Sequence, residues 1–275
     1  MRTHWRIGAA AVAATLLAGC ASPGRTTATP VRALVFNIHA GKDAAGADNL
    51  ERVADLVRAS HADIVLLQEV DNGTRRSGRV DQLSRLRSLT GFHGRFGKAI
   101  DYDGGEYGLG ILSRWPIEAS SMRMLPAVIT DSAMRARYEA RGALIAKIAS
   151  PWGSLRVIDT HLDATRDDSI RVQQTGALLV MANAERDSGF TVIGGDLNSQ
   201  PDGAVVRMLT ESGWKDIFQS CGSGQSFSFP AKAPVRRIDY LMTSSDTGCR
   251  SASVLDSQAS DHRPVFFEIV LEGAR

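Results

Sequence analysis

The chain has 275 residues, of which 43% are hydrophobic and 23% charged, and its formal net charge is +2. This length allows one large domain or two small ones, with a core that needs no disulfide or metal for its stability. The composition is typical of a soluble globular protein, and so small a net charge excludes a general positive field that would attract nucleic acid, although a local basic groove is compatible with it.

The first 19 residues have the layout of a secretory signal peptide. Arg2 and Arg6 form a short basic region, and Ile7 to Ala18 is an apolar, alanine-rich run. That run is too short to span a bilayer, which needs roughly 20 apolar residues. Residues 1–19 hold two basic residues and no acid, so their removal leaves 30 basic and 30 acidic residues and a mature net charge of zero.

The segment from Leu17 to Cys20 resembles a bacterial lipobox. In such signals the chain is cut before the cysteine, so Cys20 is the expected site of diacylglycerol attachment. Residues 20–30 are rich in Thr, Ala, Ser, Gly and Pro, and we expect them to form a flexible tether between the membrane and a domain at 31–275. Ala21 is not the Asp that retains some lipoproteins at the inner membrane. We therefore expect an exported, periplasm-facing bacterial lipoprotein, with the outer membrane favoured.

The alternative for the N-terminus is an ordinary signal peptide followed by a chance cysteine. With Cys20 assigned to lipid, Cys221 and Cys249 are left as an even pair in an exported chain. An oxidising compartment favours a disulfide between them, and two unpaired thiols are the alternative. We expect the domain to be a monomer.

After residue 30, apolar β-branched runs are interleaved with helical patterns. The longest helical pattern places Ile170, Ala177 and Leu178 on one stripe. In chain order, the predicted elements are strand Val31–Ile38, helix Asn49–Ala59, strand Ala62–Leu67, helix Asp81–Leu89, strands Leu109–Leu112, Gly142–Ile148 and Leu155–Ile158, helix Asp167–Glu185, strand Phe190–Ile193, helix Asp202–Glu211, and strands Ile238–Met242 and Pro264–Leu271. This order predicts a layered α/β (α+β) domain with mixed sheets and external helices. The polar stretch Met122–Arg141 is predicted as a loop over one sheet edge.

Polar residues follow the apolar runs at the points where the predicted strands end. Buried strands that emerge at one edge of a sheet bring such residues together. The set supplies carboxylates, amides and two histidines, without a cysteine or a serine in a nucleophile-elbow pattern. Asn37, Glu69, His161, Asp196 and Asn198 follow such runs, Asp239 lies near the start of the predicted strand Ile238–Met242, and Asp261 and His262 directly precede the last strand.

The chemistry of this set fits metal-assisted phosphoryl transfer. Oxygen ligands such as Glu69, Asn37 and Asp261 suit Mg²⁺ or Mn²⁺ better than structural zinc. A carboxylate with an amide neighbour, Asp196 with Asn198, could orient or deprotonate an attacking water. 

The two histidines would act on the phosphate group. His161 and His262 could donate to the non-bridging oxygens or to the leaving group, and Asp239 could orient His262. Taken singly, each residue has an ordinary interpretation as a solvated loop residue, a turn or a cap. The functional interpretation therefore depends on their joint order.

Eight short motifs follow one another along the domain from residue 31 to residue 271. They are Phe36-Asn37-Ile38-His39 with Gly41-Lys42-Asp43, Gln68-Glu69-Val70, Ile111-Leu112-Ser113-Arg114, Arg141-Gly142-Ala143, Thr160-His161-Leu162-Asp163, Gly194-Gly195-Asp196-Leu197-Asn198, Arg237-Ile238-Asp239-Tyr240 and Ser260-Asp261-His262-Arg263-Pro264-Val265. In content and order they resemble the motifs of the endonuclease/exonuclease/phosphatase superfamily.

The resemblance implies a four-layer α-β-β-α sandwich of two mixed β-sheets flanked by helices, as in pancreatic deoxyribonuclease. The implied roles are metal binding by Glu69, Asn37 and Asp261, positioning of water and phosphate by Asp196 and Asn198, stabilisation of the phosphate or leaving oxygen by His161, and acid/base or transition-state work by His262 with Asp239. His39 and Asp43 match the opening motif, where a site role and a role in shaping the loop are both open.

Three functions compete. The first is a Mg²⁺-dependent hydrolase acting on lipid, phosphosugar or other small phosphate esters, held at a membrane through Cys20. The second is a DNA- or RNA-cleaving nuclease on the same scaffold, which needs a basic strip. The third is a non-catalytic surface binding protein that keeps the fold. For the nuclease, the residues that could form the basic strip are Arg75, Arg76, Arg79, Arg85, Arg87 and Arg95.

Overall fold

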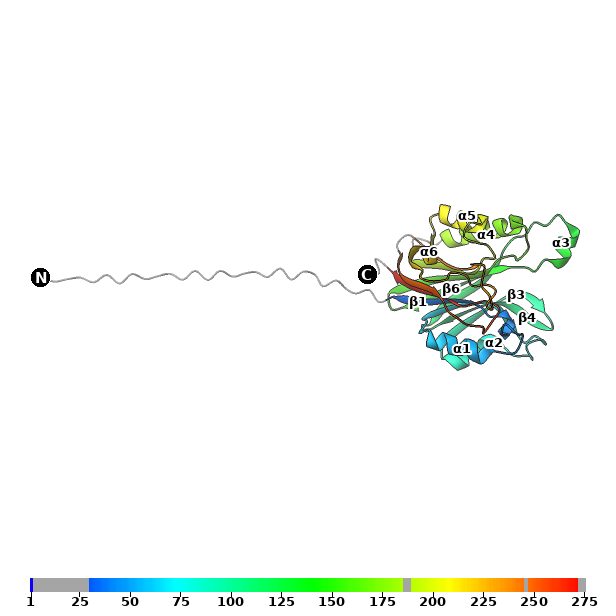
Figure 1. Ribbon diagram of the computed structural model, residues 1–275, viewed down its shortest axis with the longest axis horizontal. Helices are drawn as coiled ribbons and strands as arrows, with labels where there is room; N and C mark the ends of the chain where they lie inside the picture. The colour runs from blue at the N-terminus through cyan, green and yellow to red at the C-terminus, as the bar shows by residue number, and fades with distance from the viewer. Residues whose placement is uncertain (2–29, 185–188, 245–246, 272–275) are drawn as a thin grey trace.

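The computed structural model describes residues 30–184, 189–244 and 247–271 together with Met1. Within these ranges the strands form two six-stranded mixed sheets packed face to face, and helices cover both outer faces (Figure 1). These four layers confirm the predicted α-β-β-α sandwich. Cys20, the rest of the predicted signal peptide after Met1, and the tether up to residue 29 lie outside the described residues.

The first sheet has a parallel pair of strands at its centre. Its spatial order is β11 (Thr247–Val254), β12 (Val265–Leu271), β1 (Val31–Asn37), β2 (Ile64–Asn72), β4 (Gly105–Ser113) and β3 (His93–Tyr102). β1 and β2 are parallel, with Asn37 opposite Gln68, and the other neighbouring strands are antiparallel. The carboxyl ends of β1 and β2 therefore meet at one rim of the sheet.

The second sheet repeats this arrangement. Its spatial order is β5 (Ile117–Met124), β6 (Gly142–Ser150), β7 (Gly153–His161), β8 (Phe190–Asp196), β10 (Asp239–Thr243) and β9 (Lys215–Asp216). β7 and β8 are parallel, and their register sets His161 opposite Asp196. β10 runs antiparallel to β8, so Asp239 at its start also lies opposite Asp196. The strand pairing alone thus brings three of the predicted site residues together.

Buried apolar side chains hold the layers together. Residues such as Leu66, Val157 and Ile269 fill the space between the sheets. Helices α1 (Leu50–Ala59) and α2 (Gln82–Thr90) cover the first sheet, and α4 (Asp168–Asn183) and α5 (Ala204–Glu211) cover the second (Figure 1). Each fully buried Leu or Ile contributes about 1.5–3 kcal/mol relative to exposure. The core therefore fixes the position of the rim at which the polar residues end.

Helices α1, α2 and α4 begin within one residue of the predicted positions, and α5 begins at Ala204, two residues after the predicted start. Asp81 caps α2 by accepting a hydrogen bond from the Ser84 amide, and Asp167 caps α4 by accepting one from the Ser169 amide. Capping acids satisfy backbone donors that the first turn leaves open. 

The prediction that Met122–Arg141 is a loop is wrong in part. The stretch contains the end of β5 and the short helix α3 (Ser132–Arg137). Further elements absent from the predicted set are β3, β5, β9, β11, the helix α6 (Ile217–Cys221) and the 3₁₀ turn η1 (His39–Gly41). The strand predicted at Ala62–Leu67 starts at Ile64 and continues to Asn72 across a β-bulge after Leu67. None of the described helices has the length and apolar character needed to cross a membrane.

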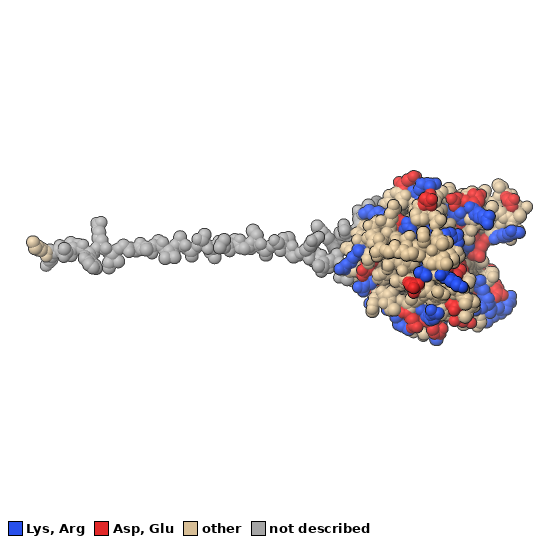
Figure 2. Space-filling model, in the orientation of Figure 1, with Lys and Arg blue, Asp and Glu red and all other residues tan. Residues whose placement is uncertain are grey.

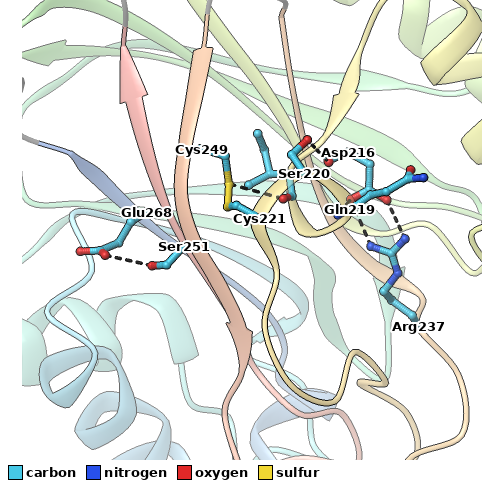
Figure 3. The surroundings of a disulfide bond; sticks show 9 residues. Asp216, Gln219, Ser220, Cys221, Arg237, Cys249, Ser251 and Glu268 are labelled. Atoms are coloured by element: carbon cyan, nitrogen blue, oxygen red, sulfur yellow. Dashed lines mark hydrogen bonds and ion pairs between the residues drawn. A yellow bond between two sulfur atoms is a disulfide. The ribbon is translucent and has the colours of Figure 1, made fainter.

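Cys221 and Cys249 form a disulfide with their Cα atoms 5.9 Å apart. The bond joins α6, which follows the edge strand β9 of the second sheet, to β11 at the edge of the first sheet (Figure 3). At the other end of α6, Asp216 caps the helix and binds Arg237 through both carboxylate oxygens, at 2.6 and 3.1 Å. The bridge closes a loop of 28 residues, for which the chain-entropy account gives about 3–4 kcal/mol of stabilisation.

Candidate active site

The predicted site residues meet at the rim where β1, β2, β7 and β8 end and β10 begins. Asn37 of β1 joins the two sheets there: its Nδ2 donates to Glu69 Oε1 at 3.0 Å and to Asp196 Oδ2 at 3.2 Å. Its Oδ1 accepts a hydrogen bond from the His39 amide at 3.0 Å. These bonds fix which end of the amide faces the acids, so Asn37 holds two carboxylates from different sheets beside each other.

Glu69 is aimed at this point by its backbone. Its φ is +58°, in the left-handed region that non-glycine residues seldom adopt, and it lies within the bulge of β2. A bulge changes the direction of a side chain and is common next to active sites. Glu69 is half-buried, whereas Asn37 and Asp196 are buried. Glu69 therefore combines a fixed direction with access to solvent.

Asp196 is shaped by the turn that follows β8. Its Oδ1 accepts the Asn198 amide at 2.9 Å, while Asn198 Nδ2 donates to the Leu162 carbonyl at 3.1 Å. Gly195, just before it, has φ +136°, and a Cβ there would lie 1.8 Å from the Thr160 carbonyl oxygen. Only glycine lets β7 and β8 approach this closely. Burial, and then the charge of Asp239, raises the pKa of the Asp196 carboxyl to about 7.

His262 stands between two buried acids. Its Nδ1 lies 2.9 Å from Asp239 Oδ2, and its Nε2 lies 3.6 Å from Asp196 Oδ2. Burial alone would lower the pKa of His262, but the charge and hydrogen bond of Asp239 and the charge of Asp196 outweigh it and raise the pKa to about 10. The imidazole is therefore a cation near neutral pH, with its Nε2–H directed at Asp196.

Two residues from the loop before β10 complete this arrangement. The buried Ser228 hydroxyl donates to Asp239 Oδ2 at 2.5 Å. The Phe229 ring lies against the His262 ring, with the centroids 4.7 Å apart. Asp239 Oδ2 thus accepts from the Ser228 hydroxyl and also faces the imidazole that it orients. The motif order gave no signal for Ser228, because its contact with Asp239 depends on the path of the loop.

His161 carries the opposite electrostatic character. Its Nε2 lies 3.5 Å from Asp196 Oδ2, and its Nδ1 lies 3.1 Å from Arg141 Nη1. Burial and the charge of Arg141 hold the pKa of His161 well below its usual range. A guanidinium can only donate, so Nδ1 of His161 must accept and the ring proton must be on Nε2. His161 is therefore a neutral donor that points at the same carboxylate oxygen as His262.

Arg141 belongs to the cluster, although the sequence analysis named it only as part of a strand motif. It is buried, it contacts His161, and its Nη1 also pairs with Glu139 Oε1 at 2.7 Å. An arginine directly before a predicted buried strand, in a chain with histidines at other strand ends, is the signal that could have suggested this role.

The opening motif divides into a site part and a loop part. His39 Nδ1 lies 3.8 Å from Asp261 Oδ1, so both residues border the cluster, and Asp261 is half-buried. Asp43 instead accepts the Ala45 and Ala47 amides at 2.9 Å each and closes its own turn. Of the two roles open for Asp43, the structure favours the shaping of the loop.

The donor set fits a hard divalent cation at Glu69. Glu69 and Asp196 converge on one amide, and the excess negative charge of these carboxylates calls for a compensating cation. The ligand atoms of Asp196, Asp239 and His262 also lie within 4.8 Å of one another. In that trio, however, both imidazole nitrogens face carboxylates, so the histidine offers no free nitrogen to an ion. The residue that could hold the ion as it stands is therefore Glu69, with Asp261 nearby, and Asn37 would join it if its amide turned so that Oδ1 faced the ion.

A sandwich with acids, amides and two imidazoles gathered at one rim defines a site of the phosphoester-hydrolase class. The comparisons with known proteins agree with this class. A profile of the Endonuclease/Exonuclease/phosphatase family matches residues 34–262. The match covers most of the chain, and the protein belongs to this family.

Relatives and solved structures extend the comparison over the same region. The uncharacterized protein YbhP of Escherichia coli K12 is 27% identical over 262 residues, which cover 90% of this chain and all of YbhP. An endonuclease/exonuclease/phosphatase from Beutenbergia cavernae superposes with a TM-score of 0.76 at 21% identity, over 90% of this chain and 72% of that one. A mannosyl-6-phosphatase of Bacteroides thetaiotaomicron gives 0.71 at 17% identity, over 87% and 99% of the two chains. At these identities the solved structures establish the shared fold.

Proposed function

We propose that the protein hydrolyses phosphate esters with Mg²⁺ as its cofactor, or with Mn²⁺ in its place. The observation that carries the proposal is a single cluster drawn from both sheets, in which Asn37 hydrogen-bonds Glu69 and Asp196 and the His262 imidazole lies 3.6 Å from Asp196. Phosphoryl transfer requires an in-line nucleophile and positive charge around the phosphate oxygens. This cluster offers a group for each requirement.

The metal would be held by Glu69 and Asn37, with Asp261 close by. When bound, Mg²⁺ supplies positive charge to a phosphate oxygen and orients the ester. The partly open surroundings of Glu69 leave space for water and phosphate oxygens, which Mg²⁺ commonly keeps as ligands. Asn37 keeps Glu69 in place through its Nδ2 bond to Oε1.

The remaining residues act on water and phosphate. Asp196, with a pKa raised to about 7, is the group that can accept the proton of the attacking water, and Asn198 fixes its carboxylate. His262, kept cationic by Asp239, donates through Nε2 to a phosphate oxygen or to the leaving oxygen. His161 donates a second hydrogen bond through its Nε2 without adding charge.

A generic diester tests the proposal. The mature protein should cleave bis-p-nitrophenyl phosphate or p-nitrophenyl phosphate in the presence of Mg²⁺, and EDTA should abolish the reaction until Mg²⁺ is restored. The same experiment with Asp196→Asn separates a catalysed reaction from a contaminant. Failure to cleave either ester at any Mg²⁺ or Mn²⁺ concentration would refute hydrolysis and favour the non-catalytic alternative.

The nuclease alternative loses support from the arrangement of its arginines. Arg75 pairs with Asp103, Arg76 with Asp71 and Arg85 with Glu51. Figure 2 shows both signs of charge over each helical layer of the visible face. Three of the six arginines of the predicted strip thus already have acid partners, and such cations gain less from phosphate contacts. Small esters are therefore the proposed substrates, and a screen of single- and double-stranded DNA and RNA is the check.

We further propose that the protein is a monomeric, exported lipoprotein, anchored through lipid on Cys20 and facing the periplasm from the outer membrane. The support is the lipobox-like segment from Leu17 to Cys20 and the absence of an acid at Ala21. Cys20→Ala should release the protein into the soluble periplasmic fraction, and mass spectrometry should find diacylglycerol on the wild-type N-terminus. A wild-type chain without lipid, present in the soluble fraction, would refute the anchor.

A further inference from the structure

A small pocket adjoins the catalytic cluster and has no part in the steps above. Its volume is about 170 Å³. Glu69 is one of its walls, and Arg141, which contacts His161, is another. A group that projects from a phosphate at the catalytic cluster can therefore enter it. The lining is formed by Glu69, Arg76, Tyr102, Tyr107, Glu139 and Arg141.

One wall of the pocket is built in advance. The side chain of Asp71 is fully buried and binds Arg76 through both oxygens at 2.8 Å, and Thr74 donates to the same carboxylate at 2.6 Å. The fixed guanidinium lies 4.5 Å from the centre of the Tyr102 ring and 5.3 Å from that of Tyr107. Two aromatic rings and a flat cation thus form a rigid surface, and Tyr102 keeps 41% of its area exposed.

Both arginines of the pocket already have acid partners, and Glu69 is a further acid in its wall. Arg76 is neutralised by Asp71, and Arg141 pairs with Glu139 at 2.7 Å. A second phosphate would meet the carboxylate of Glu139 without a cation left over to bind it. An acyl chain would meet no aliphatic side chain, because the lining consists of charged groups and phenols. The ligand that fits is neutral and rich in hydroxyl groups.

Size limits the ligand further. Pockets for drug-sized ligands have about 300–1,000 Å³, so about 170 Å³ suits a single ring. Sugar and cyclitol rings present C–H groups on their faces and hydroxyls around their edges. The face can lie on an exposed tyrosine, while carboxylate, guanidinium and phenol groups pair with the hydroxyls.

We propose that this pocket is the specificity subsite for the alcohol part of the substrate, and that this part is a neutral polyhydroxylated ring, either a sugar or a cyclitol. The inference rests on the proposed phosphoester hydrolysis. The ring occupies the pocket formed by Tyr102, Arg76 and Glu139, and its ester phosphate lies at the Asp196–His262 cluster. Phosphate esters of such rings are therefore preferred to esters of simple alcohols.

A matched pair of substrates tests the assignment. Cyclohexyl phosphate and myo-inositol 1-phosphate carry rings of the same size, and only the inositol ring bears hydroxyls. Hexose 6-phosphates and glycerophosphoinositol extend the comparison to sugars and to a diester, and p-nitrophenyl phosphate reports the catalytic cluster alone. With Mg²⁺ present, kcat/KM for at least one polyol ester should exceed that for cyclohexyl phosphate by about tenfold or more.

Variants of Tyr102 should change only the polyol reaction. Tyr102→Ala should lower kcat/KM for the preferred polyol ester by about tenfold, the scale of one lost ring contact. Tyr102→Phe keeps the ring and should stay within about threefold of wild type, and Glu139→Gln should weaken polyol binding through KM. Val180→Ala, an exposed change on α4, is the remote control.

The outcomes separate the two claims. Cleavage of p-nitrophenyl phosphate with no preference for any polyol ester would overturn the subsite and leave hydrolysis standing. A loss of p-nitrophenyl phosphate cleavage in Tyr102→Ala as large as the loss for the polyol ester would also overturn it. If no ester is cleaved at all, the proposed hydrolysis fails first. Preference for an oligonucleotide over every polyol ester would assign the ring stack to a nuclease instead.

Discussion

Asp159 and Gln68 form a buried polar pair between the two sheets that none of the proposed steps uses. Gln68 Nε2 donates to Asp159 Oδ1 at 2.6 Å, and both residues are fully buried. Gln68 Oε1 and Asp159 Oδ2 are buried and lack a hydrogen-bond partner among the described residues. Burial raises the pKa of Asp159 well above its usual range. A proton on Oδ2 would give Gln68 Oε1 its missing donor.

Asp159→Asn therefore should stabilise the protein increasingly as the pH rises. An asparagine can accept from Gln68 and donate to it without a proton to lose. In the wild type, the unfolded chain releases the Asp159 proton near pH 4 while the folded chain retains it. Stability present below that pH is lost at up to about 1.4 kcal/mol per pH unit, until the raised folded-state pKa is reached. The variant escapes this loss.

Urea unfolding of the mature protein at pH 4, 5, 6 and 7 measures the difference. The gain of Asp159→Asn over wild type should be small near pH 4, grow by about 1 kcal/mol between pH 4 and 5, and then grow by up to about 1.4 kcal/mol per pH unit. Asp55→Asn, an exposed change whose side chain is 64% accessible, is the control and should show no such growth. A gap between variant and wild type that stays constant with pH would refute the buried proton.

Four further predictions concern the catalytic cluster. His262→Ala should lower kcat on bis-p-nitrophenyl phosphate by at least about 10²-fold; a rate within about threefold of wild type, with an unchanged circular dichroism spectrum, would mean that its role is misassigned. Arg141→Met should lower kcat and let the His161 proton move from Nε2 to Nδ1, a change that ¹⁵N NMR detects. Arg141→Lys should keep the proton on Nε2. An unchanged Nε2–H signal in Arg141→Met would contradict the role of Arg141 in setting the tautomer. The rate should rise with pH through about 7 as Asp196 loses its proton, and fall above about 10 as His262 loses its own. A rate that does not rise through about 7 would count against the role of Asp196, and one that does not fall above about 10 would count against that of His262. Glu69→Ala should raise the Mg²⁺ concentration for half-maximal rate by about tenfold or more, and an identical titration curve would exclude it as a ligand.

The sequence predicted the buried strands well and the edge strands poorly. β1, β2, β7 and β8 are central and read as continuous apolar runs, which is the pattern of strands buried on both faces. β5 has one buried residue, Ile117, followed by exposed or half-exposed ones, so its sequence looks like a loop. The four-layer arrangement came from the order of the motifs, because local periodicity does not say which strands pair.

The site residues were found because most of them lie at the ends of strands, and strand ends converge. Their partners were not, because a partner such as Ser228 belongs to a loop whose course depends on the whole domain. The same limit applies to Arg141: its place before a strand is visible in the sequence, whereas its contact with His161 is a result of the register between β6 and β7. Electrostatic roles depend on burial and therefore follow only from the fold.

The disulfide has a mechanical consequence for the sandwich. A covalent bond between α6 and β11 fixes the separation of the two sheets along one side. Along the opposite side β3 and β5 adjoin through weaker links, such as the hydrogen bond from Arg95 to the Ile117 carbonyl at 3.1 Å. Thermal breathing of the two layers should therefore be widest on the side away from the sulfur bridge. Tyr102 ends the strand on that side, so amide exchange there should be the first to respond when a small molecule occupies the neighbouring hollow.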